Sequence, residues 1–465
     1  MKKLFPVLFI LLLLVLAMVA TLPFWFGMEV EKTYNNGIRQ FSGRGIALTS
    51  VNYRRGWFIS SAETTIVFPG LPFTFSAAHR ISHGPFALDR ILSGEYQFKP
   101  VQAVIKSQVS FVPLEGSSAA ANPSPPLEAD TIINIQGDGE TRLRLANFKN
   151  TLANGDVFEC KEASGTVAFN SDWKKLQVNL RLPEVSLKTQ KNNFILSKLG
   201  ADSDLQEGIA GYMFGTNSFQ IEKMTFAENN VLEGLRISTS AREAGTNVDL
   251  AMQYFLKGVT FAGETYGPAQ VAVEIRKLDA ATLVKLDSAI NEIYKKQPPK
   301  AQAGMMLTGK MLEIIADLAK KNPEMEITKF NFKTQQGEIT GKVKFALDGA
   351  NINAKENPLL LINALSGEGE ISVPASIIEA LAKKQIQQEI ERLKNSGKLT
   401  KRELEKLTPE KISAITAQLA PQRAQELAAK LQFLPNGASF QANAALKRGQ
   451  LFINNQPFHP SLKLP

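Results

Sequence analysis

The chain has 465 residues, 44% of them hydrophobic and 21% charged, and a formal net charge of +9. This length is enough for two or three domain-sized units, and the apolar content argues against wholesale disorder. Basic residues are interleaved with acidic ones, as in residues 391–411, so the surplus charge indicates a solvated mixed-charge surface and no nucleic-acid partner.

The N-terminus carries an uncharged, mostly apolar run, Leu4–Met28, preceded by Lys2 and Lys3. As a helix rising about 1.5 Å per residue, this run is long enough to cross a hydrocarbon core of about 30 Å. The leading lysines, together with Trp25 at the position of an interfacial aromatic belt, predict a single membrane-spanning anchor. A cleaved signal peptide is the alternative, although Met18 fits its cleavage site poorly. Both interpretations predict that the rest of the chain is exported.

Segments of alternating polarity follow one another from about residue 45 to residue 280, separated by turn residues. In residues 175–182, leucines and a valine at every second position alternate with polar side chains. The same period of two recurs in residues 140–146, 247–254 and 270–276. A period of two buries one face of a strand and leaves the other in water, which is typical of antiparallel sheet.

The later part of the chain adds helices. Apolar residues at three- and four-residue steps predict helices near residues 281–320 and 375–434, and two last strands form a hairpin that turns at residues 447–449. We therefore predict an α+β fold, with a single N-terminal transmembrane helix followed by an elongated, mainly antiparallel β body with two helical insertions.

The predicted domains follow from these elements. They are a membrane anchor (1–28), an N-terminal β region (29–111), a linker or long loop rich in Ser, Ala and Pro (112–130), a central β region (131–280) and a C-terminal α+β region (281–465).

Two of the three histidines, His79 and His83, lie four residues apart. On a helix this would be the spacing of zinc ligands, but Arg80 stands where such a motif needs glutamate, and Gly84 and Pro85 would end a helix. We interpret the segment as a strand that runs into a Gly-Pro turn. A histidine would cap that turn through its ring N–H, and we expect no metal site.

Other catalytic motifs are missing from the sequence: it has no nucleophile elbow, phosphate-binding loop, dinucleotide fingerprint or Cys-x-x-Cys pair. The single cysteine, Cys160, excludes an intramolecular disulfide, and no histidine is near it in sequence to activate its thiol. We expect no catalytic residue, no cofactor and no enzymatic activity.

Four stretches in a fixed order resemble the YdgA/YihF family of bacterial envelope proteins of unknown function; they are residues 52–68, 81–88, 221–238 (followed by the strand 247–259) and 448–458. Trp57, His83, Gly84 and Pro85 belong to these stretches and are expected to be structural. The resemblance implies an inner-membrane anchor with a periplasmic body and brings no catalytic residues. A fold-level analogy also links the chain to AsmA-type proteins, whose anchored, curved sheets are proposed to move lipid.

Two functions fit these patterns. The first is a non-enzymatic, inner-membrane-anchored periplasmic protein with a structural or interaction role in the envelope, in which helices cover the apolar face of the sheet. The second is a lipid-binding or lipid-transfer module, in which that face stays open as a groove. The expected partners are the inner membrane, through the N-terminal helix, and envelope proteins or phospholipid. The long amphipathic helices favour the first function, and what hides the apolar face discriminates between the two.

Overall fold

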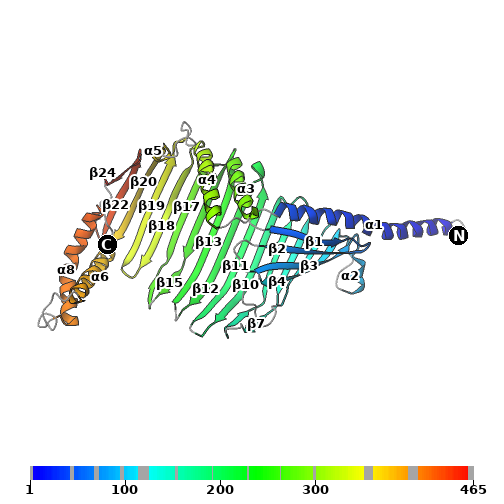
Figure 1. The fold of residues 1–465 in the computed structure, drawn as a ribbon, viewed down its shortest axis with the longest axis horizontal. Coiled ribbons are helices and arrows are strands. Elements are labelled where there is room, and N and C mark those ends of the chain that lie inside the picture. The colour runs from blue at the N-terminus through cyan, green and yellow to red at the C-terminus, as the bar shows by residue number, and fades with distance from the viewer. Residues whose placement is uncertain are drawn as a thin grey trace. The chain divides into compact units, whose positions relative to one another are not determined.

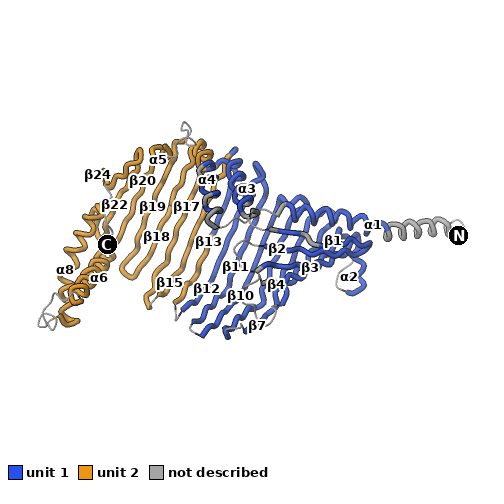
Figure 2. Tube along the Cα trace, in the orientation of Figure 1, with its two compact units in different colours: residues 1–228, 238–246, 279–314 blue, residues 229–237, 247–278, 315–465 orange. Residues whose placement is uncertain are grey.

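The computed structural model describes residues 4–41, 47–67, 73–94, 99–113, 125–151, 155–190, 192–227, 230–261, 263–296, 300–349, 360–395 and 407–458. The chain divides into two compact units (Figure 2): unit 1 comprises residues 1–228, 238–246 and 279–314, and unit 2 comprises residues 229–237, 247–278 and 315–465. Lys2, Lys3, His459 and most of the predicted linker (114–124) lie outside the described residues.

Unit 1 is built on an antiparallel ladder in which each strand pairs with the next (Figure 1). The strands are β1 (Ala47–Arg54), β2 (Ile59–Val67), β3 (Phe73–His83), β4 (Ala103–Pro113), β5 (Leu127–Ile133), β6 (Gly139–Leu145), β9 (Ala163–Phe169), β10 (Lys175–Lys188), β11 (Asn193–Glu207) and β12 (Met213–Phe226). The short strands β7 (Phe148–Thr151) and β8 (Val157–Cys160) pair with each other, and β8 pairs with the end of β10.

The ladder has one apolar and one polar face. On β10, Val178 and Leu180 lie on the apolar face, between Val167 and Gly165 of β9 and Ser203 and Ala201 of β11. On the polar face, the Asn179 side-chain amide and the Arg181 guanidinium donate to the Asp202 carboxylate, at 2.6 and 2.8 Å. The strand-rich, antiparallel character predicted from the alternation is confirmed.

The predicted transmembrane helix is wrong. Helix α1 (Leu4–Phe41) does not end near Met28 but continues for more than three turns, and this continuation packs on β1, β3 and β4. Val30, on the packed side, is 1% exposed, whereas Lys32 is exposed to water. Among the described helices, none is both long and apolar enough to cross a membrane.

Helices and one 3₁₀ turn complete unit 1, and the last helix, α4 (Lys300–Ala319), continues into unit 2. Helix α2 (Leu88–Leu92) packs on β3, and helix α3 (Ala280–Lys296) packs on the 3₁₀ turn η1 (Ile209–Gly211). The Asp279 carboxylate accepts hydrogen bonds from the backbone N–H and the hydroxyl of Thr282, which satisfies an orphan donor at the start of α3. Helix α4 follows α3.

Unit 2 contains a second antiparallel ladder. Its strands, in pairing order, are β14 (Asn247–Leu256), β17 (Ala269–Asp279), β18 (Glu324–Thr334), β19 (Gly337–Leu347), β20 (Leu365–Pro374), β22 (Ser439–Lys447), β23 (Gln450–Ile453) and β24 (Gln456–Pro457). The strand β21 (Leu434–Asn436) pairs with the start of β22, and the start of β13 (Asn230–Ala244) pairs with β15 (Gly258–Phe261), which pairs with β16 (Glu264–Tyr266).

Two helices of unit 2 form a close hairpin. The short helix α5 (Leu360–Ala364) precedes β20, and α6 (Ala375–Asn395) follows it and packs on α8 (Pro409–Lys430). Small side chains spaced four apart on α8 are buried against α6: Thr416, Ala420, Ala424 and Ala428. The hairpin continues into a hydrophobic cluster with Val373 of β20 and Phe440 of β22. These helices therefore pack on one end of the unit 2 sheet.

Candidate functional site

His83 ends β3 in the interior of unit 1 and is 2% exposed. Its Nδ1 donates to the Trp57 carbonyl oxygen at 3.1 Å, so the neutral ring accepts a hydrogen bond at Nε2 from the Ser60 hydroxyl, at 2.8 Å. Helix α1 crosses the ring at Gly27, where an added Cβ would lie 2.5 Å from Cε1 of His83. Burial lowers the pKa of His83. The ring joins two strands and contacts the helix above them.

The Gly-Pro turn after His83 brings backbones together. Gly84 N–H donates to the Gln102 carbonyl and Val101 N–H donates to the Pro85 carbonyl, both at 2.8 Å. A Cβ at Gly84 would lie 1.8 Å from the Val101 oxygen, so no side chain fits there. The turn therefore requires glycine for a close backbone approach.

The two tryptophans singled out in the sequence lie at the surface. Trp57 is 51% exposed and its ring is 5.0 Å from the ring of Phe24 on α1. Trp25 is 50% exposed and contacts the neighbouring ring of Phe26. Neither side chain reaches the interior of the unit.

His79 lies four residues before His83 on β3. It belongs to a row of paired polar groups under α1. The hydroxyls of Tyr34 and Thr64 share a hydrogen bond of 2.6 Å, the Thr64 hydroxyl lies 2.9 Å from His79 Nε2, and His79 Nδ1 lies 2.7 Å from the Ser107 hydroxyl. We call these four residues the hydroxyl–imidazole row. Burial lowers the pKa of His79 to about 4, so the ring is neutral at neutral pH.

Below α1, beside this row, lies a cavity of about 240 Å³. Its roof is the second half of α1, with Val30 and Thr33 among the lining residues, and its floor is the inner face of β3 to β6, including Ile105 and Ile133. None of its lining residues carries a charge at neutral pH. We call it the α1 cavity.

An aromatic pair lines the α1 cavity on the side of β9. The rings of Phe169 and Trp173 are stacked, with centroids 3.9 Å apart and an interplanar angle of 8°. Gly37 of α1 faces this pair, and an added Cβ would touch the Trp173 ring at 3.4 Å. Since Phe169 pairs with Leu176 of β10, the cavity floor continues directly into the apolar face of the next strands.

That apolar face is partly open to solvent. In the described part of unit 1, α1 packs on β1, β3 and β4, and α3 packs on η1. On β10, Leu180 is 36% exposed and Val178 is only half-buried, although both lie on the same face as the closed residues under α1. An exposed face of this kind, rather than a set of titratable groups, is the candidate functional site.

Comparison with known proteins gives a family but no activity. A family model described as a bacterial protein of unknown function (DUF945) matches residues 1–461. The chain belongs to the DUF945 family. No curated protein and no solved structure matches it. Because the DUF945 description names no ligand, the function has to be argued from the geometry.

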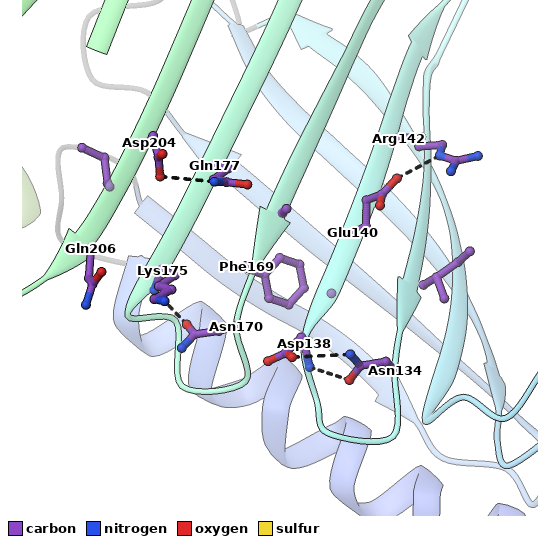
Figure 3. Close-up of a pocket in the computed structure, with 14 residues that line it drawn as sticks. Asn134, Asp138, Glu140, Arg142, Phe169, Asn170, Lys175, Gln177, Asp204 and Gln206 are labelled. Carbon is purple, nitrogen blue, oxygen red and sulfur yellow. Dashed lines mark hydrogen bonds and ion pairs between the residues drawn. The ribbon is translucent and has the colours of Figure 1, made fainter. Parts of the chain in front are cut away.

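The opposite, polar face of this DUF945 sheet is hollowed over β6, β9, β10 and β11, with a volume of about 690 Å³ (Figure 3). The charged and amide groups there bond to one another: Arg142 donates to Glu140 at 3.0 Å, and Gln177 donates to Asp204 at 3.3 Å. The carboxylates of Glu140 and Asp204 lie on different strands with separate partners. The hollow is therefore a solvated, self-paired surface, and its carboxylates do not form a general acid–base pair.

Metal and thiol chemistry find little support in the DUF945 residues that the structure describes. Within them, no group of three or more His, Cys, Asp or Glu side chains could hold a metal ion. Both ring nitrogens of His79 and of His83 lie within hydrogen-bonding distance of hydroxyl or carbonyl oxygens. Cys160 is buried, its Sγ contacts the Lys161 carbonyl at 3.3 Å, and burial raises the pKa of the thiol.

The sheet of unit 2 of the DUF945 chain also has one apolar and one polar face, formed by different residues. The apolar face of β20 carries Gly367, where an added Cβ would lie 2.6 Å from the Phe345 ring, so this ring lies over the glycine. Met325 and Ile371 on the same ladder are each 37% exposed. The polar face carries ion pairs such as Lys342–Glu370, at 3.1 Å. Unit 2 thus also has a partly exposed apolar sheet face.

Proposed function

We propose that the apolar sheet face of unit 1 binds the acyl chains of phospholipids, and that the protein is a non-enzymatic lipid-binding or lipid-transfer module of the bacterial envelope. The observation that carries the proposal is the partial exposure of Leu180 and Val178, beyond the strands on which α1 packs. A hydrocarbon chain laid on these side chains removes both surfaces from water, which is favourable by about 25 cal/mol per Å² of apolar area.

The dimensions of the face support an acyl chain as the occupant. From β6 through β9, β10 and β11 to β12 there are four strand-to-strand steps of about 4.8 Å, or about 19 Å in all. An acyl chain in one leaflet reaches about 15 Å, half of a hydrocarbon core of about 30 Å. One chain therefore fits across these strands, approximately perpendicular to them.

An envelope location is part of the proposal, with the protein at the inner membrane and its body in the periplasm. The apolar N-terminal run behind two lysines supports export of the body, and the ordered likeness to YdgA/YihF proteins supports the envelope. The analogy with AsmA-type proteins supports lipid as the cargo at fold level only.

The test is extraction of bound lipid from the full chain, purified from bacterial membranes in mild detergent, followed by mass spectrometry. Wild type should carry phospholipid near stoichiometry, and Val178→Asp or Leu180→Asp should lose about tenfold or more, because a carboxylate cannot be buried against an acyl chain without a partner. Ser164→Asp on the polar face, where Ser164 pairs with Arg144 and Arg181, is the matched control and should retain lipid. Wild type without lipid would refute the proposal.

A second candidate, an interaction role in the envelope, is favoured by the α6–α8 hairpin of unit 2. Leu381 of α6 is 53% exposed, and Ile415 and Leu419 of α8 form a ridge one turn apart that is also exposed. Exposed apolar ridges of this kind are typical of protein-binding helices. A photo-crosslinking residue placed at position 381 or 415 in cells should capture one envelope protein. Labelling that is diffuse, and equal to labelling from the exposed control position Glu410, would rule the role out.

A further inference from the structure

We propose that the α1 cavity is the closed end of the lipid site and receives the methyl end of an acyl chain that lies on the apolar face. This inference rests on the lipid binding proposed above. It adds a position, a direction for the ligand and a limit on its length. Three properties of the α1 cavity carry it: continuity with the open face, the chemistry of the lining, and the volume.

The α1 cavity and the open face share one sheet surface. Thr141 of β6 lines the cavity and pairs with Val167 of β9, which pairs in turn with Val178 of β10. Residues directly opposite one another in an antiparallel ladder project to the same face. A chain lying on Val178 can therefore continue along this row beneath α1 without leaving an apolar surface.

The lining accepts hydrocarbon and rejects a headgroup. The polar groups at the wall are paired with one another: the hydroxyl–imidazole row is continuous from Tyr34 to Ser107, and the Thr131 and Thr141 hydroxyls share a hydrogen bond of 2.8 Å. No lining residue is a lysine or an arginine, so a phosphate would be buried without a counter-charge. The end of the lipid that enters is therefore the methyl end.

The volume sets a length. A methylene group fills about as much space as a water molecule, about 30 Å³, so the cavity of about 240 Å³ holds roughly eight methylenes. The stacked Phe169 and Trp173 rings line it on the side of β9, and Ile81 of β3 lines it at the opposite side. The cavity should therefore limit the length of the acyl chains that the site accepts.

A larger side chain at Thr33 should reduce this limit on acyl-chain length. Thr33 projects from α1 into the α1 cavity and stands outside the hydroxyl–imidazole row. Thr33→Phe should shift the bound lipids toward chains shorter by roughly two or three methylenes, since the added ring carbons occupy about that volume. The full chain is incubated with phosphatidylglycerols that differ only in acyl length, and the bound species are counted by mass spectrometry. Lys32→Phe, at the adjacent exposed position, is the control and should leave the length profile unchanged. Should Thr33→Phe fail to fold, Thr33→Leu makes a smaller change in the same direction.

A second readout locates the methyl end directly. Phosphatidylglycerol with a photoactivatable diazirine at the acyl terminus should label peptides that contain Thr33 or Ile105, which line the cavity away from β10. If lipid binds but the label falls only on β10 to β12, and Thr33→Phe leaves the length profile unchanged, this inference is overturned while the proposed function stands. If wild type binds no phosphatidylglycerol at all, both fail together.

Discussion

One row of inward-facing side chains crosses the sheet of unit 1, and its two ends differ in their exposure to solvent. At one end, Ile81 of β3 lies under α1 and is 0% exposed. At the other end, the row reaches Val178 of β10, whose neighbour Leu180 on the same face is 36% exposed. Both strands have the same alternation, so their pattern alone does not decide burial. The helix decides it: where α1 crosses, the face becomes core, and beyond α1 it remains a surface.

Matched truncations test that comparison most strongly. Ile81→Ala should lower the free energy of unfolding by about 3–4 kcal/mol, because it leaves a void in a closed core. Leu180→Ala should cost about 1 kcal/mol, because its side chain is already partly in water. Denaturant unfolding of the full chain, followed by circular dichroism, measures both. Equal losses would mean that the face around Leu180 is covered.

Acid should weaken the covered region and spare the open one. The pKa of His79 is lowered to about 4, below the ordinary value of about 6.5 that the unfolded chain would have, so the unfolded state binds more protons between these values. The contribution of the neutral ring is therefore complete above about pH 6.5 and is lost as the pH falls toward 4. The total is about 3 kcal/mol. Unfolding midpoints of wild type between pH 7.5 and 4.5 should show this fall, and His79→Gln should reduce it, while the lowered pKa of His83 leaves a smaller fall of the same sign. A variant with an unchanged pH slope would show that another group titrates.

The contact between α1 and His83 gives a smaller effect. Gly27→Ala places a methyl group 2.5 Å from the His83 ring, so the helix or the ring must move, at a net cost of about 1–2 kcal/mol. Gly304 in α4 is the matched control, because an added Cβ there meets nothing within 4 Å. Gly304→Ala should stabilise the chain by up to about 1 kcal/mol through helix propensity. Thermal unfolding distinguishes the two, and shifts of the same sign would argue against close packing at Gly27.

The smallest effect is expected on the polar face. The ion pair between Arg144 and Glu162 spans 2.8 Å, but both side chains are more than half exposed. Glu162→Gln should therefore change the free energy of unfolding by less than about 0.5 kcal/mol. A larger loss in the same denaturant assay would show that the polar face, too, contributes to holding the sheet together.

The strand pattern was readable from the sequence, because a strand alternates by its own geometry. Residues 175–182 were predicted to place Val178 and Leu180 on one face, and β10 does so. The end of α1 was not readable from hydropathy, because the apolar run stops at Met28 while the helix continues. A signal was present: Val30, Tyr34 and Gly37 follow the three- and four-residue steps of a packed helix face.

The candidate site was only half visible in the sequence. The Gly-Pro turn after His83 has a local signature, and it was expected as architecture. The partners of His79 come from three other elements, so they are recognisable only once the strands are in register. Hydroxyl residues at inward positions, such as Thr64 and Ser107, were the available hint. The α1 cavity has no local signature at all, since its roof and floor are far apart in the chain.

The hydroxyl–imidazole row also bears on how the strands find their alignment. Slipping a strand by one residue sends every side chain to the opposite face, and apolar residues alone penalise only part of such errors. The row spans β2, β3 and β4 and satisfies the His79 ring only when Thr64 and Ser107 reach it from both sides. A slip of two residues would keep His79 on the inner face but remove both partners, at a cost of about 1–3 kcal/mol. The same polar groups that line the cavity wall without charge therefore penalise incorrect strand register during folding.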